Sequence, residues 1–422
     1  MNILWLTNIP LPEASELLNE RSIPFGGWMV NTSMALSEQD NVNLSISFPE
    51  KEISKIKILK GKRIKYYAFS TVSNKIVASN CCNVQFEQIL GRVKPDIVHI
   101  FGTEYLNTLL MVNTCNKMNI KVVISIQGLV SVYYHHYMAY LSDKVMRRFT
   151  FRDLIKQDNL KQQQKKFVNR GKFEIEAIQK VHHVIGRTTW DKACTTQINP
   201  NVKYHFCNET LREEFYKHQW SLEKCERNSI FVSQSSYPIK GIHLMLEAMP
   251  LILKTFPNTK LYISGYDITK SDTLKEKLKK TSYAKYIIEI IQKYNLKNNV
   301  IFTDLLDEKQ MCERYLESNV FVCPSSIENS PNSLGEAMIL GVPCVASDVG
   351  GVSDMLKHKE EGFLYQADAP YMLAYYVCEI FGNEEIALKF SRNSRKHALK
   401  THDREVNLNR LLNIYKELTN EQ

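Results

Sequence analysis

The 422-residue chain contains no uninterrupted apolar run of about 18 residues, the length that a membrane-spanning helix requires. Its first residues, MNILWLTNIPLP, include neither a basic leader nor a small-residue cleavage site, so we expect a buried strand there and no signal peptide. The ten cysteines include no CxxC pair, which favours buried, reduced thiols over a disulfide or metal framework. These absences favour a cytoplasmic protein.

Hydrophobic residues make up 44% of the sequence and charged residues 23%, which is typical of a globular protein. A chain of this length exceeds one ordinary core, so we expect two domains. The pattern of short apolar runs and longer amphipathic runs occurs twice, before and after the polar segment 221–228. This repetition predicts two Rossmann-like, doubly wound α/β domains, 1–220 and 221–403, that face each other across a cleft.

Basic residues gather in the first half of the chain. Residues 1–205 carry 27 Lys and Arg against 16 Asp and Glu, whereas residues 206–422 carry 27 against 29. Much of the excess lies in the segment 144–172, with ten basic residues against two acidic ones. This cluster favours an anionic partner, either a membrane surface or a diphosphate-bearing substrate, although a solvated helical face explains it equally well. Nucleic acid is not expected, because no recognised binding motif accompanies the charge.

Four tyrosines lie within or next to this basic segment, and the whole of 129–176 has a helical pattern. Basic and aromatic helices of this kind often lie on a membrane surface. Packing of the tyrosines into the protein core is the other interpretation, and the sequence leaves both open. The tyrosines are Tyr133, Tyr134, Tyr137 and Tyr140.

The stretch 318–356 has the features of a strand, a polar loop, a helix and a second strand. Ser333 is a candidate N-cap, and Glu336 follows at the spacing of a capping box. Two carboxylates, Glu328 in the loop and Glu336 in the helix, are then expected at the carboxyl end of a parallel sheet, where open α/β folds bind ligands.

Lys240 and Gly241 also follow a predicted strand and open a helix. An ammonium group beside the free N–H groups of a helix start suits a diphosphate. The helix that begins near Ser333 offers a second set of N–H groups, and Glu336 is suited to accept hydrogen bonds from a ribose diol. The glycine pair Gly26-Gly27 opens a helix in the first half, which is a weaker signal of the same kind.

With these residues the chain resembles the family 4 retaining glycosyltransferases, part of the glycosyl transferases group 1, which have the GT-B fold. Glu328 and Glu336, with seven residues between them, match the E-x7-E motif of that family. The following GVPCVASDVGG and the earlier YPIKGIH match the strand-turn and the donor-phosphate lysine region, and Gly26-Gly27 stands where the family has its glycine loop. The resemblance also implies that the terminal helix, within 404–422, crosses back to the first domain.

The resemblance implies a role for each matched residue. Glu336 would hold the ribose, Lys240 would neutralise the departing diphosphate, and Glu328 would stabilise positive charge on the donor sugar. Amides near Ser333 and Leu334 would complete the phosphate cradle. No Asp-x-Asp motif occurs, and we expect neither a metal nor a cofactor.

The chain departs from the family at two positions. Gln234 is the nearest match to an arginine that many members have before the phosphate lysine, and Gln127 stands where many have a histidine. A glutamine can hydrogen-bond a sugar hydroxyl but cannot take a proton. By its position Gln127 is nevertheless assigned to the catalytic residues, together with Glu328 and Lys240. The nearby His99, His135 and His136 are interpreted as structural.

The sequence therefore predicts a retaining glycosyltransferase that acts in surface polysaccharide biosynthesis. Its donor would be a nucleotide-diphosphate sugar with UDP favoured, and its acceptor a glycan or a lipid-diphosphate-linked sugar at the inner face of the plasma membrane. Two alternatives remain open. One is a GT-B nucleotide-sugar epimerase, and the other a degenerate subunit that binds nucleotide sugar without catalysis.

Overall fold

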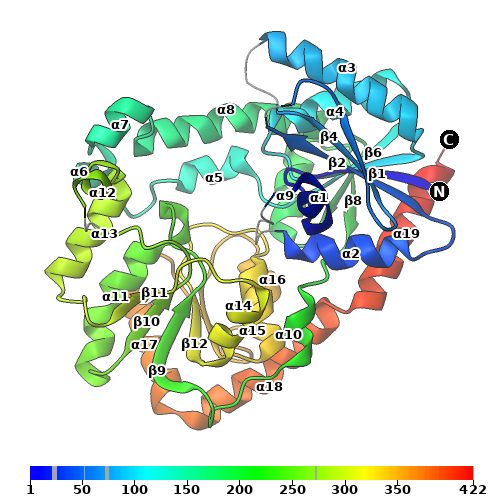
Figure 1. The fold of residues 1–422 in the computed structure, drawn as a ribbon. Helices are drawn as coiled ribbons and strands as arrows, with labels where there is room; N and C mark the ends of the chain where they lie inside the picture. The colour runs from blue at the N-terminus through cyan, green and yellow to red at the C-terminus, as the bar shows by residue number, and fades with distance from the viewer. Residues whose placement is uncertain (21–25, 52, 72–75, 271–272, 422) are drawn as a thin grey trace. The chain divides into compact units, whose positions relative to one another are not determined.

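The computed structural model describes residues 1–20, 26–51, 53–71, 76–270 and 273–421, and among these all side chains except those of 76–82 and 275. The chain forms two compact units (Figure 1). Unit 1 comprises residues 1–132, 167–212 and 402–422, and unit 2 comprises residues 133–166 and 213–401.

Unit 1 is built on an eight-stranded sheet in the order β3-β4-β2-β1-β5-β6-β7-β8. Its pairings are parallel except for that of β3 with β4. The strands are β1 (Asn2–Leu6), β2 (Asn43–Glu50), β3 (Lys57–Lys60), β4 (Lys65–Ser70), β5 (Ile97–Phe101), β6 (Lys121–Ser125), β7 (His183–Gly186) and β8 (Lys203–Phe206). The helices of this unit are α1 (Pro12–Leu18), α2 (Gly27–Ser37), α3 (Ile76–Val93), α4 (Leu106–Lys117), α9 (Thr189–Ile198) and α19 (Arg404–Asn420).

The central strands β1 and β6 of the unit 1 sheet are buried on both faces, which explains why they are mostly apolar runs. In β1, Ile3 and Trp5 belong to one hydrophobic core, whereas Leu4 and Leu6 belong to the core on the opposite face. The helix α19 packs on the first of these cores, and the Trp5 indole donates a hydrogen bond to the Tyr415 hydroxyl at 3.0 Å. The terminal helix therefore returns to the N-terminal unit, as expected from the sequence.

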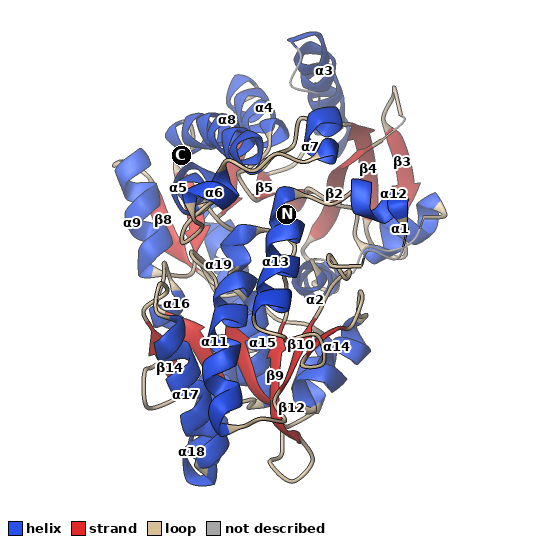
Figure 2. Ribbon diagram, turned by 90° about the vertical axis from the view of Figure 1, so that its left-hand side faces the viewer, coloured by secondary structure: helices blue, strands red, loops and turns tan. Residues whose placement is uncertain are grey.

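Unit 2 is built on a six-stranded parallel sheet in the order β11-β10-β9-β12-β13-β14. The strands are β9 (Glu226–Val232), β10 (Lys260–Ile263), β11 (Val300–Phe302), β12 (Ser318–Cys323), β13 (Cys344–Ser347) and β14 (Phe363–Tyr365). Helices flank them (Figure 2). They are α10 (Glu213–Lys217), α11 (Ile242–Thr255), α12 (Leu274–Leu278), α13 (Ser282–Lys293), α14 (Glu308–Leu316), α15 (Asn332–Leu340), α16 (Val352–Met355), α17 (Pro370–Gly382) and α18 (Glu384–Thr401).

Two segments that the sequence analysis assigned to the first domain have their contacts in unit 2. One is 213–220, where Trp220 is 3% exposed and its indole donates to the Ser318 carbonyl at 2.8 Å. The other is 133–166, which includes α6 (Asp143–Met146), α7 (Phe151–Lys156) and parts of α5 (Val130–His136) and α8 (Leu160–Gln179). Residues 226–228, predicted as linker, are the first residues of β9.

Among the described residues, no helix is both long enough and apolar enough to cross a membrane.

Candidate functional site

Lys240 and Glu328 form an ion pair at the carboxyl edge of the unit 2 sheet. A short 3-10 helix, η1 (Pro238–Lys240), follows β9, and Glu328 lies in the loop after β12. Lys240 Nζ is 2.6 Å from Glu328 Oε1, to which the Ser325 hydroxyl donates at 2.8 Å. The two charged side chains are only 19% and 9% exposed. Because the strand order reverses between β9 and β12, the pair occupies the switch point of the sheet, the usual ligand position in such folds.

The charge on Glu328 keeps Lys240 protonated. Burial, the largest single influence, would lower the pKa of Lys240, but the charge and hydrogen bond of Glu328 together with Tyr237 and Cys323 outweigh it and raise the pKa above its ordinary value. The result is a permanent cation in a partly buried position, where it interacts with an anion more strongly than it would in water.

Two glycines allow the loops around this pair to approach closely. Gly241 has φ +69°, and a Cβ there would lie 1.7 Å from the Pro324 carbonyl oxygen. Gly350 has φ +55°, and a Cβ there would lie 1.9 Å from the Glu328 carbonyl oxygen. The loops after β9 and β13 are thus packed against the loop of Glu328 with no room for a side chain.

Tyr133 is a part of this site that the sequence analysis did not identify. Burial raises the pKa of its hydroxyl well above the ordinary value, and the charge of Glu328 raises it further, while Lys240 and a hydrogen bond with the Asn329 main chain act in the opposite direction. Tyr133 therefore lies within electrostatic range of both members of the pair. The helical pattern around Tyr133 predicted a helix but gave no signal for this position.

Of the other predicted tyrosines, Tyr137 is 2% exposed and donates its hydroxyl to Gln163, whereas Tyr140 is 44% exposed. Core packing is therefore correct for Tyr137, and the tyrosines do not share one exposed face.

The helix α15 starts earlier than the capping-box pattern predicted. Its N-cap is Pro331 in an extended conformation, with no side-chain cap, and Ser333 is already inside the helix. The predicted capping box is therefore wrong, because the Pro331 carbonyl accepts from the amides of Leu334 at 3.0 Å and Gly335 at 3.3 Å. A phosphate bound at Leu334 would share this amide with Pro331.

Glu336 lies on α15 with 7% exposure, so the helix holds its carboxylate in a buried position. Gln234 is exposed in the loop between β9 and η1. The structure thus brings Lys240 and Glu328 into contact, while Glu336 and Gln234 lie on the neighbouring helix and loop of the same unit.

The predicted residues of unit 1 lie at the start of α2 and after β6. Gly26 is the N-cap of α2 with φ +74°. Gly27 follows as the first helical residue, and a Cβ there would lie 2.8 Å from the Arg212 side chain. Gly26 can therefore adopt a left-handed backbone conformation at the N-cap, and Gly27 leaves room for the Arg212 side chain beside it.

Gln127 is held by a charged pair that the sequence analysis missed. Its Nε2 donates to Glu209 Oε1 at 2.7 Å, and its Oε1 accepts from Arg187 at 3.5 Å. Arg187 and Glu209 are themselves joined at 2.5 Å, with side chains 4% and 11% exposed. Trp28 lines the same small cavity of about 40 Å³, together with these three side chains. No sequence spacing links residues 127, 187 and 209, which meet because β6, β7 and β8 are neighbouring parallel strands.

His99 is a structural residue, as interpreted from the sequence. It is 1% exposed, and its ring nitrogens contact the Tyr415 hydroxyl at 2.6 Å and the Ser125 hydroxyl at 2.7 Å. Burial lowers its pKa to about 3, so the ring is neutral at physiological pH and exchanges protons poorly there.

The described residues contain no group of three or more His, Cys, Asp or Glu side chains placed to hold a metal ion.

Residues 213–397 match the model of the family described as glycosyl transferases group 1. The matched segment is less than half of the chain. It contains Lys240, Glu328 and Glu336, the residues on which the resemblance rested.

Two relatives illustrate the extent of the similarity. YtcC of Bacillus subtilis is 27% identical over 185 residues, which is 43% of this chain and 43% of the relative. The poly(ribitol-phosphate) alpha-N-acetylglucosaminyltransferase of Staphylococcus aureus is 26% identical over 179 residues, 42% of this chain and 33% of the relative. The matched segments span less than half of each relative.

Among solved structures, Anabaena HepE in complex with UDP and glucose superposes with a TM-score of 0.68 at 13% identity, over 100% of both chains. This likeness extends to both units and shows that the chain has the GT-B fold.

Proposed function

We propose that the protein is a retaining glycosyltransferase that transfers a sugar from a nucleotide-diphosphate sugar to a glycan or lipid-diphosphate-linked acceptor in surface polysaccharide biosynthesis. The observation that carries the proposal is the Lys240–Glu328 ion pair at the switch point of the unit 2 sheet, inside the group 1 segment. UDP is favoured as the nucleotide because it is bound in the HepE structure. A polymeric acceptor is favoured because the S. aureus relative is named for poly(ribitol-phosphate).

In this reaction the bond between the donor C1 and the diphosphate oxygen breaks, and its electron pair stays with the diphosphate. Lys240 neutralises the charge that builds there, which is often the largest contribution to such catalysis. Glu328 stabilises the positive charge that develops at the sugar ring. The acceptor hydroxyl oxygen bonds to C1 on the face that the diphosphate leaves, and its proton passes to the departing diphosphate.

The remaining predicted residues bind the donor. Glu336 accepts hydrogen bonds from the ribose, and Gln127 bonds a sugar hydroxyl. The residues assigned to the diphosphate are Gly26, Gly27, Gln234, Ser333 and Leu334. We propose that the reaction needs no metal, because Lys240 supplies the cation. We also propose a peripheral contact with an anionic membrane, where a lipid-linked acceptor would be reached from the cytoplasm.

A thermal-shift screen across UDP-, GDP- and ADP-glucose tests the donor assignment. A ligand at about 100 times its Kd stabilises the folded protein by about 2.7 kcal/mol. We expect a shift with the UDP-sugar and with UDP, and a much smaller one in the Lys240→Met variant. A larger shift with GDP- or ADP-sugar would overturn the UDP assignment, and no shift with any of them would overturn the proposal.

The Glu328→Gln variant tests the catalytic step. The amide oxygen can still accept from Ser325, but the negative charge is lost. We expect nearly unchanged donor binding and a fall in transfer of about 10²- to 10³-fold. Unchanged transfer would refute the role of Glu328.

Analysis of the nucleotide sugar after incubation with the protein distinguishes a transferase from the two alternative functions, an epimerase and a binding subunit. Wild-type protein that converts the donor into an epimer without any acceptor would be an epimerase, and protein that binds donor without transfer or hydrolysis would be a binding subunit.

A further inference from the structure

The helix α7 exposes its apolar face to solvent. Phe151, Leu154 and Ile155 are 54%, 64% and 63% exposed, and Phe149, just before the helix, is 53% exposed. Positions 151, 154 and 155 have the i, i+3, i+4 spacing that places side chains on one side of a helix. Single exposed apolar residues are common on proteins, but four of them within seven residues form a patch.

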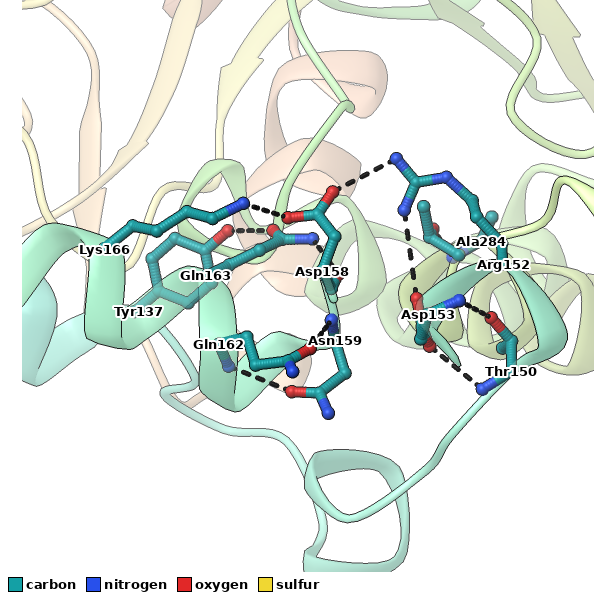
Figure 3. A network of polar contacts seen from close by, with 11 residues as sticks. Tyr137, Thr150, Arg152, Asp153, Asp158, Asn159, Gln162, Gln163, Lys166 and Ala284 are labelled. Atoms are coloured by element: carbon teal, nitrogen blue, oxygen red, sulfur yellow. Dashed lines mark hydrogen bonds and ion pairs between the residues drawn. The ribbon is translucent and has the colours of Figure 1, made fainter. Parts of the chain in front are cut away.

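Two charged side chains of the same helix, Arg152 and Asp153, take part in a network of polar contacts (Figure 3). Asp153 is fully buried, and its side chain forms a capping box with the N-cap residue Thr150 of α7. One of its carboxylate oxygens lies 3.8 Å from the Arg152 guanidinium. Arg152 also reaches Asp158 at 3.1 Å, and Lys166 reaches it at 2.7 Å. Partial burial would raise the pKa of Asp158, but Lys166 and Arg152 hold it below its ordinary value. On α7 the buried Asp153 and the partly buried Arg152 are therefore ion-paired, while Leu154 and Ile155 are exposed to solvent.

The apolar patch is fixed to the body of unit 2. Arg148, between α6 and α7, forms an ion pair of 2.7 Å with Glu289 on α13. Val145 of α6 is 3% exposed, and the Thr150–Asp153 capping box defines the start of α7. The orientation of the patch is thus imposed by a network of contacts, and the apolar side chains cannot turn inward without breaking it.

Positive charge surrounds the patch. Residues 144–166 include eight Lys and Arg and two acidic residues, and both acids are engaged in the ion pairs just described. The outward-facing charges of 144–166 are therefore cationic, and the one exposed carboxylate directly before them, Asp143, lies 4.0 Å from Arg147. The exposed cations are Lys144, Arg147, Lys156, Lys161, Lys165 and Lys166.

We propose that this surface, made of Phe149, Phe151, Leu154 and Ile155 with its cationic border, docks on the surface of an anionic phospholipid bilayer. The apolar side chains enter the headgroup region while the cations pair with lipid phosphates, the two contributions that bind interfacial helices. A second copy of this chain fits less well, because it would bring two cationic borders together. This surface would bring the protein to the membrane that carries a lipid-linked acceptor. Only the link to that acceptor rests on the proposed function; the binding to the bilayer does not.

Vesicle co-sedimentation tests the assignment, with the full chain and no donor or acceptor present. The vesicles are phosphatidylcholine alone, or with about a third phosphatidylglycerol. We expect binding to the anionic vesicles that is at least tenfold stronger than to the neutral ones and weakens between low and high salt, because screening acts on exposed charges.

Two double variants with matched controls locate the surface. Leu154→Ser with Ile155→Ser should weaken binding to anionic vesicles at least tenfold, whereas Tyr371→Ser with Tyr375→Ser should not. The control tyrosines lie on α17 of unit 2 and are 62% and 55% exposed.

The charge variant Lys144→Ser with Lys156→Ser should weaken binding and flatten its salt dependence, whereas Lys396→Ser with Lys400→Ser on α18 should do neither.

The assignment is overturned if wild-type protein binds no vesicle at low salt, or if the α7 variants bind like their controls. It is also overturned if Leu154→Ser with Ile155→Ser abolishes self-association or binding of a soluble protein while vesicle binding persists. The thermal shift with UDP-sugar should be unchanged in the α7 variants. A failure of the membrane assignment is therefore distinguishable from a failure of the proposed glycosyltransferase function, in which the wild type shows no such shift.

Discussion

The ion pair between Lys240 and Glu328 predicts a measurable energetic coupling in the unliganded protein. We consider Lys240→Met, Glu328→Gln and the double variant, a cycle that removes each charge alone and then both. Each single change leaves one partly buried charge without its partner, whereas the double change leaves none. The cost of the two single changes should therefore exceed the cost of the double change.

The magnitude follows from the geometry. At the observed 2.6 Å separation, two unit charges attract by about 6 kcal/mol in an effective dielectric of about 20. The desolvation of two side chains that are 19% and 9% exposed offsets much of this. We expect each single variant to lose about 3 kcal/mol of unfolding free energy and the double variant about 4 kcal/mol, which gives a coupling of about 2 kcal/mol.

Because a two-domain chain need not unfold in one step, the assay is hydrogen exchange of peptides from β9 and β12, which reports local opening. The matched control is the pair Arg227–Glu384, which approaches to 2.5 Å but is 49% and 62% exposed. Its cycle should give less than about 0.5 kcal/mol. Additive single variants at the Lys240–Glu328 pair, with a coupling no larger than in the control, would refute the argument.

Three further predictions follow from the same contacts. Burial lowers the pKa of His99 from 6.5 to about 3, so its neutral ring stabilises the folded protein fully above pH 6.5, and this stability is lost as the pH falls toward 3. When the pH is lowered from neutral to 5, hydrogen exchange of β5 should therefore show about 2 kcal/mol more loss of stability in the wild type than in His99→Asn. In thermal melts with and without UDP, Gly241→Ala should lower the stability by more than 2 kcal/mol and weaken UDP binding, because its Cβ would lie 1.7 Å from the Pro324 carbonyl oxygen. The control Gly91→Ala, which has open space around the added Cβ, should change neither the stability nor UDP binding. EDTA should leave the transfer rate unchanged, and a loss of rate that Mg²⁺ restores would contradict the role of Lys240 as the cation.

The strands β1 and β12 were predictable because each is a short, mostly apolar and buried run, whereas the more exposed β3 was not predicted. The strand expected within the first residues is β1, and the strand expected at the start of 318–356 is β12. The placement of Lys240 and Glu328 at one edge of the sheet was predictable, since residues after neighbouring parallel strands meet there. Their ion pair was not predicted, because the sequence does not show which way the two side chains turn.

The segment 133–166 shows where such patterns stop being informative. Its periodicity indicates amphipathic helices, but the direction of each face depends on partners far along the chain. Asp153 can be buried because Arg152 lies beside it and Asp158 and Lys166 complete the network. Glu289 on α13 then fixes the segment in unit 2. Neither the unit to which the segment belongs nor the exposure of Leu154 could be read from spacing.

Gln127 illustrates a departure that the structure explains chemically. Its Nε2 donates to Glu209 and its Oε1 accepts from Arg187, so the orientation of the amide is fixed by a buried ion pair. One N–H and one oxygen lone pair remain, which together suit a hydroxyl that both accepts and donates. An amide held in this way cannot act as a base. If the proposed transfer occurs, the acceptor proton must therefore go elsewhere, and the departing diphosphate is the base available on the reacting face. The substitution at Gln127 is thus compatible with catalysis, provided that this residue recognises the sugar and does not take its proton.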